Sequence, residues 1–468
     1  MRANNQGNRQ YSKLKREYAA FGIFDIKLHI GVIMKIVFIG AGMASLVAGE
    51  RLARAGFDVS VYEKDTYDTL SYDWHDDVNR DAFDMYGLPL PEEGTYFTKR
   101  NWTFVPPAER IEVNLHLPEE QLDWSTERRK LAQQYVDRAK DVVDFHLGQK
   151  VDGLIVEGDK VNGIVVGGEK VYADLVVDNS GAMSPFRAEL PKSAHITAKP
   201  QKNEIFVAYR SFNKKADGVE DPKNTNRAYL KHLGEEGISW SIIDPAGTVN
   251  ILIGRAGELT KDTFDRAYKA LKASNPIISD EVVRGGINCI IPIRYPLTRM
   301  VADGYAAIGD AAFMTIPMIG SGIENSMKAA CILADTIIKS NSVKKEDLWQ
   351  YEVQYYKMRG ADHVGVDVLK RWLLGAKPQD LDWLFEKGVV DDSNMAAGAT
   401  GKLIVLSPKD LVVKVARGWT RLPLLLAMNN MLMRSKKAAK IAKKIPQNYD
   451  ENKIAKWESK IEKLVYHK

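Results

Sequence analysis

The stretch Met34-Lys-Ile-Val-Phe-Ile-Gly-Ala-Gly-Met-Ala-Ser45 decides the fold. Residues 36–39 within it form a continuous apolar run, which is typical of a buried parallel strand. Gly40 permits a tight turn, and Gly42 lets the backbone approach a pyrophosphate. Ser45 is small enough to take the place of a third glycine, where the following helix packs closely on the strand. The stretch therefore predicts a dinucleotide cradle.

The residues that follow complete a βαβ unit. A helix over 45–55 is predicted to point its first amides at the phosphates. A second strand over 59–62 ends at Glu63, 23 residues after Gly40. A carboxylate at that place accepts hydrogen bonds from the adenosine ribose hydroxyls and repels a 2′-phosphate. A glycine-rich turn in another α/β unit is the alternative, and it leaves the ordered sequence of signals unexplained.

Further motifs indicate which dinucleotide is bound. Residues 173–181 and 304–312 are two more buried strands that end in small-residue turns, the second at Gly309-Asp310, and residues 317–326 begin a long helix. Residues 178–187 carry an Asp-x-Ser-Gly turn with a later arginine. The order of these motifs resembles the FAD-dependent superfamily with the p-hydroxybenzoate hydroxylase fold. Within it the chain is most similar to the geranylgeranyl reductase family, over about residues 34–360.

The resemblance implies an FAD site and assigns residues to it. The family's aspartate at the position of Asp310 holds the ribityl chain, and a helix amino terminus faces the flavin pyrimidine edge, where free amides stabilise negative charge. Arg128 resembles the arginine that begins an FAD-contacting helix; a solvated helical arginine is the alternative. The predicted cofactor-binding residues are Gly40, Gly42, Ala44, Ser45, Glu63, Lys64, Arg128, Ser180, Gly181, Gly309, Asp310, Gly320, Ser321, Gly322 and Ile323.

The predicted fold class is α/β, or α+β overall, with interleaved domains. A Rossmann-like FAD-binding domain is expected from 34–68, 124–187 and 286–340, and a mixed-sheet substrate domain from 69–123 and 188–285. Residues 341–468 are predicted to be a helical region with a basic amphipathic stretch at 411–445. Residues 1–33 are expected to be a disordered extension or an artefact of the chosen start codon.

Composition excludes several classes of protein. The 468 residues are 45% hydrophobic, enough for a real core. The two cysteines, Cys289 and Cys331, cannot build a disulfide framework or a four-thiolate metal site, so a reducing, cytoplasmic compartment and no metal are expected. No run reaches the roughly 18 apolar residues that span a bilayer.

The net charge of +5 is unevenly distributed. Residues 411–445 hold nine Lys or Arg and no Asp or Glu, next to the apolar run 422–428. This pattern suits a helix at the anionic cytoplasmic face of a membrane, and it argues against nucleic acid as the partner. A packed terminal helix with a solvated lysine flank is the other interpretation, and both stay open.

The predicted catalytic residues are His75 and Asp76, in the segment 72–77. Imidazole can exchange a proton near neutral pH, as reduction of a double bond requires. A structural histidine is the alternative for His75. Members of the family often carry a cysteine in this segment and this chain has none, so the resemblance fixes neither the proton donor nor the substrate.

The leading functional hypothesis is an FAD-dependent reductase of carbon–carbon double bonds in a prenyl lipid or quinone. Its reductant would be ferredoxin, a nicotinamide or a deazaflavin. The alternative is a flavin monooxygenase of an aromatic or polyketide-like substrate, although Ser180-Gly181 stands where such enzymes usually show Asp-Gly. A flavin halogenase is a weaker alternative, because this chain has no Trp-x-Trp-x-Ile-Pro motif. An electron-transfer flavoprotein that reduces quinone commonly adds an iron–sulfur cluster, and two cysteines cannot hold a four-cysteine cluster. A non-enzymatic binding module with a vestigial flavin site is also disfavoured, because the flavin-binding motifs of this chain are intact.

Overall fold

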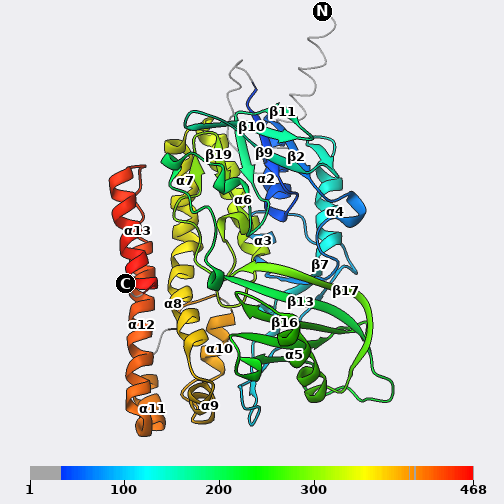
Figure 1. Cartoon of the computed structure of the whole chain (residues 1–468), viewed down its shortest axis with the longest axis vertical. Coiled ribbons are helices and arrows are strands. Elements are labelled where there is room, and N and C mark those ends of the chain that lie inside the picture. Colours follow the sequence, from blue (N-terminus) through cyan, green and yellow to red (C-terminus); the bar gives the residue numbers. More distant parts are fainter. Residues whose placement is uncertain (1–32, 400, 405–406, 467–468) are drawn as a thin grey trace, which may run out of the picture. The chain divides into compact units, whose positions relative to one another are not determined.

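The computed structural model describes residues 33–399, 401–404 and 407–466. From Met34 on, these residues belong to one compact unit, Met34–Lys468. Figure 1 shows this unit, with its sheets and its C-terminal helices labelled. The predicted extension at 1–33 lies outside the described residues, apart from Ile33. The sequence predicted an α/β fold with interleaved segments, and the fold class is confirmed.

A six-stranded sheet carries the dinucleotide cradle. Its order is β18-β19-β12-β1-β2-β8, and only β18 runs antiparallel to its neighbour. The strands are β1 (Lys35–Ile39), β2 (Asp58–Glu63), β8 (Asp144–Leu147), β12 (Leu175–Asp178), β18 (Val301–Ala302) and β19 (Tyr305–Ala307). Because parallel strands end at one edge, the turns after β1, β12 and β19 meet there.

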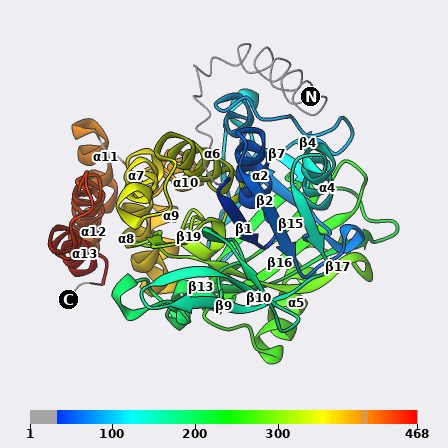
Figure 2. The same cartoon turned by 90° about the horizontal axis from the view of Figure 1, so that it is seen from above.

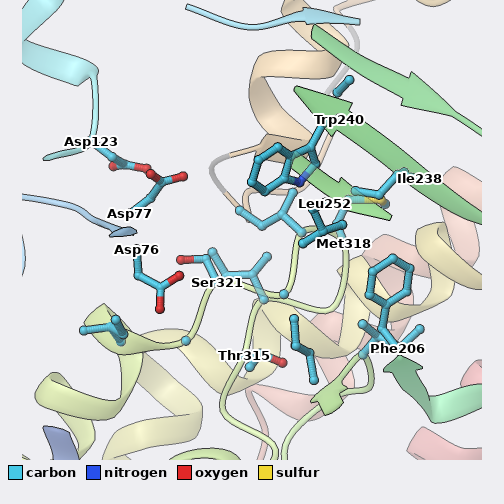
Figure 3. Close-up of a pocket in the computed structure, with 18 of the residues that line it drawn as sticks. Asp76, Asp77, Asp123, Phe206, Ile238, Trp240, Leu252, Thr315, Met318 and Ser321 are labelled. Carbon is cyan, nitrogen blue, oxygen red and sulfur yellow. The ribbon is translucent and has the colours of Figure 1, made fainter. Parts of the chain in front are cut away.

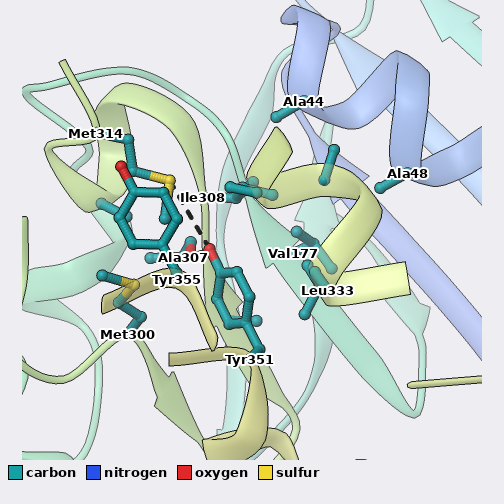
Figure 4. Packing of buried hydrophobic residues seen from close by; sticks show 14 of the residues in the cluster. Ala44, Ala48, Val177, Met300, Ala307, Ile308, Met314, Leu333, Tyr351 and Tyr355 are labelled. Atoms are coloured by element: carbon teal, nitrogen blue, oxygen red, sulfur yellow. Dashed lines mark hydrogen bonds between the residues drawn. The ribbon is translucent and has the colours of Figure 1, made fainter. Parts of the chain in front are cut away.

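Helices α2 (Met43–Arg54), α4 (Arg128–Ala139) and α6 (Ile323–Ser340) pack around this sheet. Small side chains let α2 and α6 approach each other and the strands, so Ala44, Ala48 and Leu333 lie in one cluster with Val177 of β12 (Figure 4). A tyrosine of α7 (Lys345–Tyr355), Tyr351, closes the cluster by donating a hydrogen bond to the carbonyl of Ala307 at 3.1 Å. The core therefore lies under the turns that form the cradle.

A seven-stranded sheet forms the second part of the fold, in the order β17-β13-β16-β15-β14-β5-β6. Its strands are β5 (Thr103–Val105), β6 (Val113–Asn114), β13 (Ile205–Lys215), β14 (Asn226–Leu230), β15 (Gly237–Ile243), β16 (Val249–Ala256) and β17 (Ile278–Pro292). Helix α5 (Lys261–Ser274) packs on one face. Because β17 pairs with β13 along its length, residues 286–292 belong to this sheet and not to the FAD-binding segment predicted for them.

Two small sheets and several short turns connect these parts. One contains β3 (His75–Val78), β4 (Tyr96–Thr98) and β7 (Trp124–Glu127), and the other contains β9 (Val151–Glu157), β10 (Lys160–Val166) and β11 (Glu169–Tyr172). Helix α3 (Asp81–Asp84) follows β3. The 3-10 turns are η1 (Tyr67–Thr69), η2 (Glu119–Gln121), η3 (Phe186–Ala188), η4 (Lys192–Ala194), η5 (Lys202–Glu204), η6 (His232–Gly234) and η7 (Gly309–Ala312).

The C-terminal region is helical, as predicted. After α7 come the π-helical turn η8 (Tyr356–Gly360), α8 (Ala361–Gly375), α9 (Pro378–Glu386), α10 (Asp392–Ala399), α11 (Pro408–Gly418), the 3-10 turn η9 (Trp419–Arg421), α12 (Leu422–Ala442) and α13 (Glu451–Val465). Helix α12 packs against α8, where a Cβ on Gly365 would lie 2.9 Å from the carbonyl oxygen of Ser435. Among the described residues, no helix is both long and apolar enough to cross a bilayer.

Candidate functional site

A cavity of about 1430 Å³ begins at the cradle and extends between the two large sheets to the C-terminal helices. Its lining includes Gly42 after β1, Asp310 in η7, Trp240 on β15 and Leu432 on α12. A typical small-molecule pocket has about 300–1000 Å³. The cavity therefore has room for a dinucleotide and a second molecule together.

Close approach of two turns explains the glycines of the cradle. Gly40 has φ +90°, and a Cβ there would lie 2.6 Å from the carbonyl oxygen of Asn179, in the turn after β12. A Cβ on Gly42 would lie 2.6 Å from the amide nitrogen of the Asn179 side chain. That amide donates a hydrogen bond to the Ser45 hydroxyl at 2.9 Å. Gly42 and Ala44 line the cavity, whereas Gly40 and Ser45 hold the two turns together behind it.

Glu63 lies at the carboxyl end of β2, where it lines the cavity with Lys64. Its carboxylate accepts hydrogen bonds from the backbone N–H groups of Ala41 at 2.8 Å and Asp65 at 2.9 Å. These contacts fix the carboxylate beside the cradle and leave lone pairs for a ligand hydroxyl. Lys64 is exposed and pairs with Asp65 at 3.0 Å.

The turn after β12 is organised by a buried carboxylate. Asp178 accepts hydrogen bonds from the hydroxyls of Ser180 at 2.6 Å, Ser184 at 2.5 Å and Tyr305 at 2.8 Å. Arg187 is also buried and donates hydrogen bonds to the carbonyls of Ala182 and Ala311, both at 2.7 Å. The predicted motif 178–187 thus ties the β12 turn, including Ser180 and Gly181, to η7 at the end of β19.

Asp310 faces the cavity from η7. Burial and the nearby Asp76 raise the pKa of Asp310, while Arg128 opposes the shift. No group in the described part of the chain donates a hydrogen bond to its carboxylate, so its oxygens remain available to a ligand. Gly309, before it, has φ +63° and passes close to the Asn179 side chain.

The amino terminus of α6 lies beside Asp310. Gly320, Ser321, Gly322 and Ile323 all line the cavity. A Cβ on Gly322 would lie 2.9 Å from the Thr315 side chain and 3.3 Å from the Asp310 carboxylate, so only glycine lets the helix start so close. The first amides of a helix have no intrahelical acceptor, and they carry partial positive charge toward this part of the cavity.

Arg128 and Asp76 meet at the centre of the cavity wall. The Asp76 carboxylate accepts hydrogen bonds from Arg128 at 2.8 Å, from Arg210 at 3.0 Å and from the Trp74 indole at 3.2 Å. The Arg128 guanidinium also lies 4.9 Å from the Tyr72 ring centre. A carboxylate held by two guanidiniums positions both of them, which makes Asp76 a positioning residue in this geometry.

His75 is buried, and its imidazole contacts side chains other than Asp76. Its Nε2 lies 2.6 Å from the Glu127 carboxylate and 3.1 Å from the Arg284 guanidinium, and its ring meets the edges of Phe97 and Phe212. Burial would raise the pKa of Glu127, but the hydrogen bonds from His75 and Arg284 outweigh burial and lower that pKa to about 2. These contacts favour a structural role, and the catalytic assignment of His75 stays a prediction.

The structure also places a cluster of polar side chains in the cavity wall that the motifs did not indicate. Lys99 forms an ion pair with Asp77, and Asp123 accepts a hydrogen bond from Asn79 at 3.1 Å. Burial, and then the charge of Asp77, raise the pKa of Asp123 to about 6. Figure 3 shows Asp76, Asp77 and Asp123 on one side of the cavity, opposite Trp240 and Leu252.

Beyond the carboxylates the cavity is lined by apolar side chains. Phe206, Ile238, Trp240 and Leu252 belong to the seven-stranded sheet, and Met318 precedes α6 (Figure 3). Trp372 and Leu381 pack in an apolar cluster, and both line the cavity together with Phe385. The apolar spacing of these residues along the chain indicates only that one side of each helix is buried. It therefore does not reveal that α8 and α9 enclose part of the cavity. Among the described residues no group of His, Cys, Asp and Glu could hold a metal ion.

Comparison with known proteins supports this architecture. Residues 39–83 match a family described as an NAD(P)-binding Rossmann-like domain. The chain is 22% identical over 435 residues to a digeranylgeranylglycerophospholipid reductase of Sulfolobus acidocaldarius, covering 88% of this chain and 92% of the relative. A geranylgeranyl bacteriochlorophyll reductase-like structure from Thermoplasma acidophilum superposes with a TM-score of 0.67, at 16% identity, over 85% of this chain and 99% of the other. These similarities support the geranylgeranyl reductase-like family that the sequence motifs resemble.

Other members of the wider fold share this family's architecture. A flavin-dependent brominase superposes with a TM-score of 0.56 at 17% identity, over 83% of this chain and all of the brominase. At that identity the likeness concerns the fold alone. Proteins named as reductases and as a brominase therefore share one fold, so the fold alone does not identify the reaction of this chain. The residues of the site have to be compared with the needs of each reaction.

Proposed function

We propose that the protein binds FAD and reduces carbon–carbon double bonds of a prenyl lipid or prenyl quinone. The observation that carries the proposal is the continuity of the cavity, which passes from the dinucleotide cradle into an apolar space bounded by α8, α9 and α12. An extended apolar chain with its reacting part next to the cradle fits that space. The name of the Sulfolobus relative supports the same substrate class.

The chain's residues fit FAD. The cradle at Gly42 accepts a pyrophosphate and Glu63 can accept from adenosine ribose hydroxyls. Asp310, which lacks a partner in the described part of the chain, can hold ribityl hydroxyls. The first amides of α6 would then face the pyrimidine edge of the flavin, where they would stabilise negative charge. The other predicted cofactor residues that line the cavity are Ala44, Lys64, Arg128, Ser180, Gly181, Gly320, Ser321, Gly322 and Ile323.

When bound and reduced, the flavin supplies hydride to the double bond. The protein has to orient the substrate, exclude water and hold a proton. The ring centres of Trp74 and Trp240 each lie 5.2 Å from the Arg210 guanidinium, and the three side chains together form part of the cavity wall. Asp123 can hold a proton on its carboxyl oxygen in mildly acidic solution, up to about pH 6, because burial raises its pKa to about 6. It is a better candidate donor than Asp76, whose oxygens already accept from three side chains.

Anaerobic reoxidation of the flavin tests the proposed function. The purified protein is reduced with dithionite, which removes any dependence on ferredoxin, nicotinamide or deazaflavin, and is then mixed with a geranylgeranyl lipid in detergent. We expect the flavin absorbance to return without oxygen, together with a product two hydrogens heavier by mass spectrometry. A flavin that stays reduced until air is admitted, with oxygen incorporated into an aromatic substrate, would instead support the monooxygenase.

His75→Gln tests the role of the imidazole. Loss of a buried, charge-assisted hydrogen bond to Glu127 is expected to lower the free energy of unfolding by about 1–3 kcal/mol. The rate of flavin reoxidation by the prenyl substrate should change only a few-fold, as a positioning contact implies. His195→Gln is the control, since His195 is exposed. A rate loss above a hundredfold with unchanged stability would restore His75 as the proton donor.

A further inference from the structure

Helices α11 and α12, with the turn η9 between them, expose a group of large apolar side chains. Of the 21 large hydrophobic residues that are exposed in the described part of the chain, eight lie between positions 411 and 433. They are Leu411, Val412, Val413, Val415, Trp419, Leu422, Leu426 and Met433, with Val412 at 69%, Trp419 at 67% and Leu426 at 62% exposed. We call this set the apolar face. Such a concentration on one helical hairpin marks an interaction surface.

The apolar face continues along α12 into a lysine row. Leu422, Leu426, Met433, Lys437 and Lys440 follow one another at intervals of four, seven, four and three residues, which places them on one side of the helix. Lys437 and Lys440 are exposed. Figure 1 shows α12 outside α8, and α11 at the lower end of α12. One side of α12 is thus apolar in its first half and cationic in its second.

Neighbouring acidic groups do not neutralise this row. No Asp or Glu occurs from Leu411 to Ile445. Asp410, just before, is occupied as part of the capping box of α11 with Ser407. Two arginines of the hairpin have protein partners, since Arg417 donates to the Gly388 carbonyl at 2.9 Å and Arg421 pairs with Asp380 at 2.8 Å. The lysine row is therefore the charge available to an outside partner.

The inner side of the same helices lines the cavity. Lys414 of α11 and Met428, Met431 and Leu432 of α12 are all part of its wall. Lys414 is buried, and its ammonium group donates hydrogen bonds to the Val389 carbonyl at 2.6 Å and to Asp391 at 2.7 Å. These bonds compensate for the burial of the charge and tie α11 to the segment after α9. One layer of helix therefore separates the apolar face from the apolar end of the cavity.

We propose that the apolar face and the lysine row dock the enzyme on an anionic lipid bilayer, so that the substrate's isoprenoid chain enters the cavity from the membrane. An amphipathic helix that lies in the interface buries its apolar side about 5–10 Å deep and gains from lysines near anionic headgroups. Trp419, at the joint of the two helices, suits this interface because its ring is apolar and its N–H is polar. The entry route rests on the proposed function, whereas the docking does not.

Co-sedimentation with vesicles tests the docking without substrate. We expect the full chain to bind vesicles of phosphatidylcholine mixed with phosphatidylglycerol, and to bind vesicles of phosphatidylcholine alone more weakly. Val412→Ser/Leu426→Ser should weaken binding roughly tenfold or more through lost apolar burial. Lys437→Glu/Lys440→Glu should remove the preference for the anionic vesicles. The matched control is Met85→Ser/Val283→Ser, which changes two other exposed apolar residues, at 57% and 49% exposure, and should bind as the wild type does.

Two more measurements make the outcome unambiguous. The fluorescence of Trp419 is the difference between the emission of the wild type and that of Trp419→Phe. This difference should shift to shorter wavelength when anionic vesicles are added. Equal vesicle binding by wild type and Val412→Ser/Leu426→Ser, or a dimer in solution that this variant abolishes while vesicles bind neither form, would overturn the proposal. Vesicle binding without any reaction of prenyl lipids would leave the docking intact and refute the proposed function instead.

Discussion

Gly40→Ala is expected to yield protein that purifies almost free of flavin and melts at a lower temperature. Gly40 has φ +90°, where an alanine costs about 1–2 kcal/mol. Its Cβ would also lie 2.6 Å from the Asn179 carbonyl oxygen, which is backbone and cannot rotate away. The turns after β1 and β12 would have to separate, and they form the cradle together. Flavin content should fall roughly tenfold or more, because about 1.4 kcal/mol of lost binding is already tenfold.

Gly56→Ala is the matched control for this experiment. Gly56 also has a positive φ, +98°, but a Cβ there would meet no atom within 4 Å. It should therefore show the backbone strain without the contact, and so lose stability while keeping its flavin. Flavin absorbance per chain and the melting temperature separate the two effects. Flavin retained by Gly40→Ala at the wild-type level would contradict the role of the two-turn contact.

Local signals made the cradle predictable from the sequence. The apolar run before Gly40, the acid at Glu63 and the Gly309-Asp310 turn are each set by neighbours in the chain, so their spacing carries the structural information. The helix predicted over 45–55 is α2, Met43–Arg54, and the strand predicted over 59–62 is β2, Asp58–Glu63. Parallel strands then bring distant turns to one edge of the sheet by rule.

The substrate end was not predictable in the same way. Arg210 reaches Asp76 across 134 positions, and Asp123 meets Asp77 through a loop that has no motif. Apolar residues on α8 and α9 have the same helical pattern whether they fill a core or enclose a cavity, because periodicity reports which side is buried and not what covers it. The pattern around Trp372 and Phe385 therefore does not distinguish a core from a cavity wall, and the cavity appears only when the helices are assembled.

The basic stretch shows an intermediate case. Its charge and apolar run were evident from residues 411–445, but two interpretations remained, since sequence does not say which side of α12 packs. In the structure Leu425, Met431 and Leu432 face inward, whereas Leu422, Leu426 and Met433 are exposed. Packing of one side on α8 thus does not use up the apolar residues of the helix, which is why a second partner is proposed for the other side.

A second large effect is expected at Glu204, where Glu204→Gln should lower the free energy of unfolding by about 3–5 kcal/mol. Glu204 is fully buried before β13 and forms ion pairs with Arg294 at 3.2 Å and Arg371 at 2.8 Å, and it accepts a hydrogen bond from the Tyr466 hydroxyl at 2.6 Å. The amide would leave the buried Arg294 guanidinium without its anion, and Arg371 would keep only its pair with Asp367 at 3.0 Å. Glu258→Gln, which breaks an exposed pair with Lys202, is the control and should change nothing measurable.

The pH dependence of that difference identifies its cause. Burial alone would raise the pKa of Glu204, but the guanidinium of Arg294 and the hydrogen bond from Tyr466 outweigh it, so the pKa lies below its ordinary value of 4.5. A carboxylate with a depressed pKa contributes stability that is fully present above its ordinary pKa and is lost as the pH falls toward the folded-state pKa. The gap between wild type and Glu204→Gln in urea unfolding should therefore be constant above about pH 5 and narrow below pH 4.5. A gap that is independent of pH would mean that shape, and not charge, holds β13 to α8 and thereby closes the apolar end of the cavity.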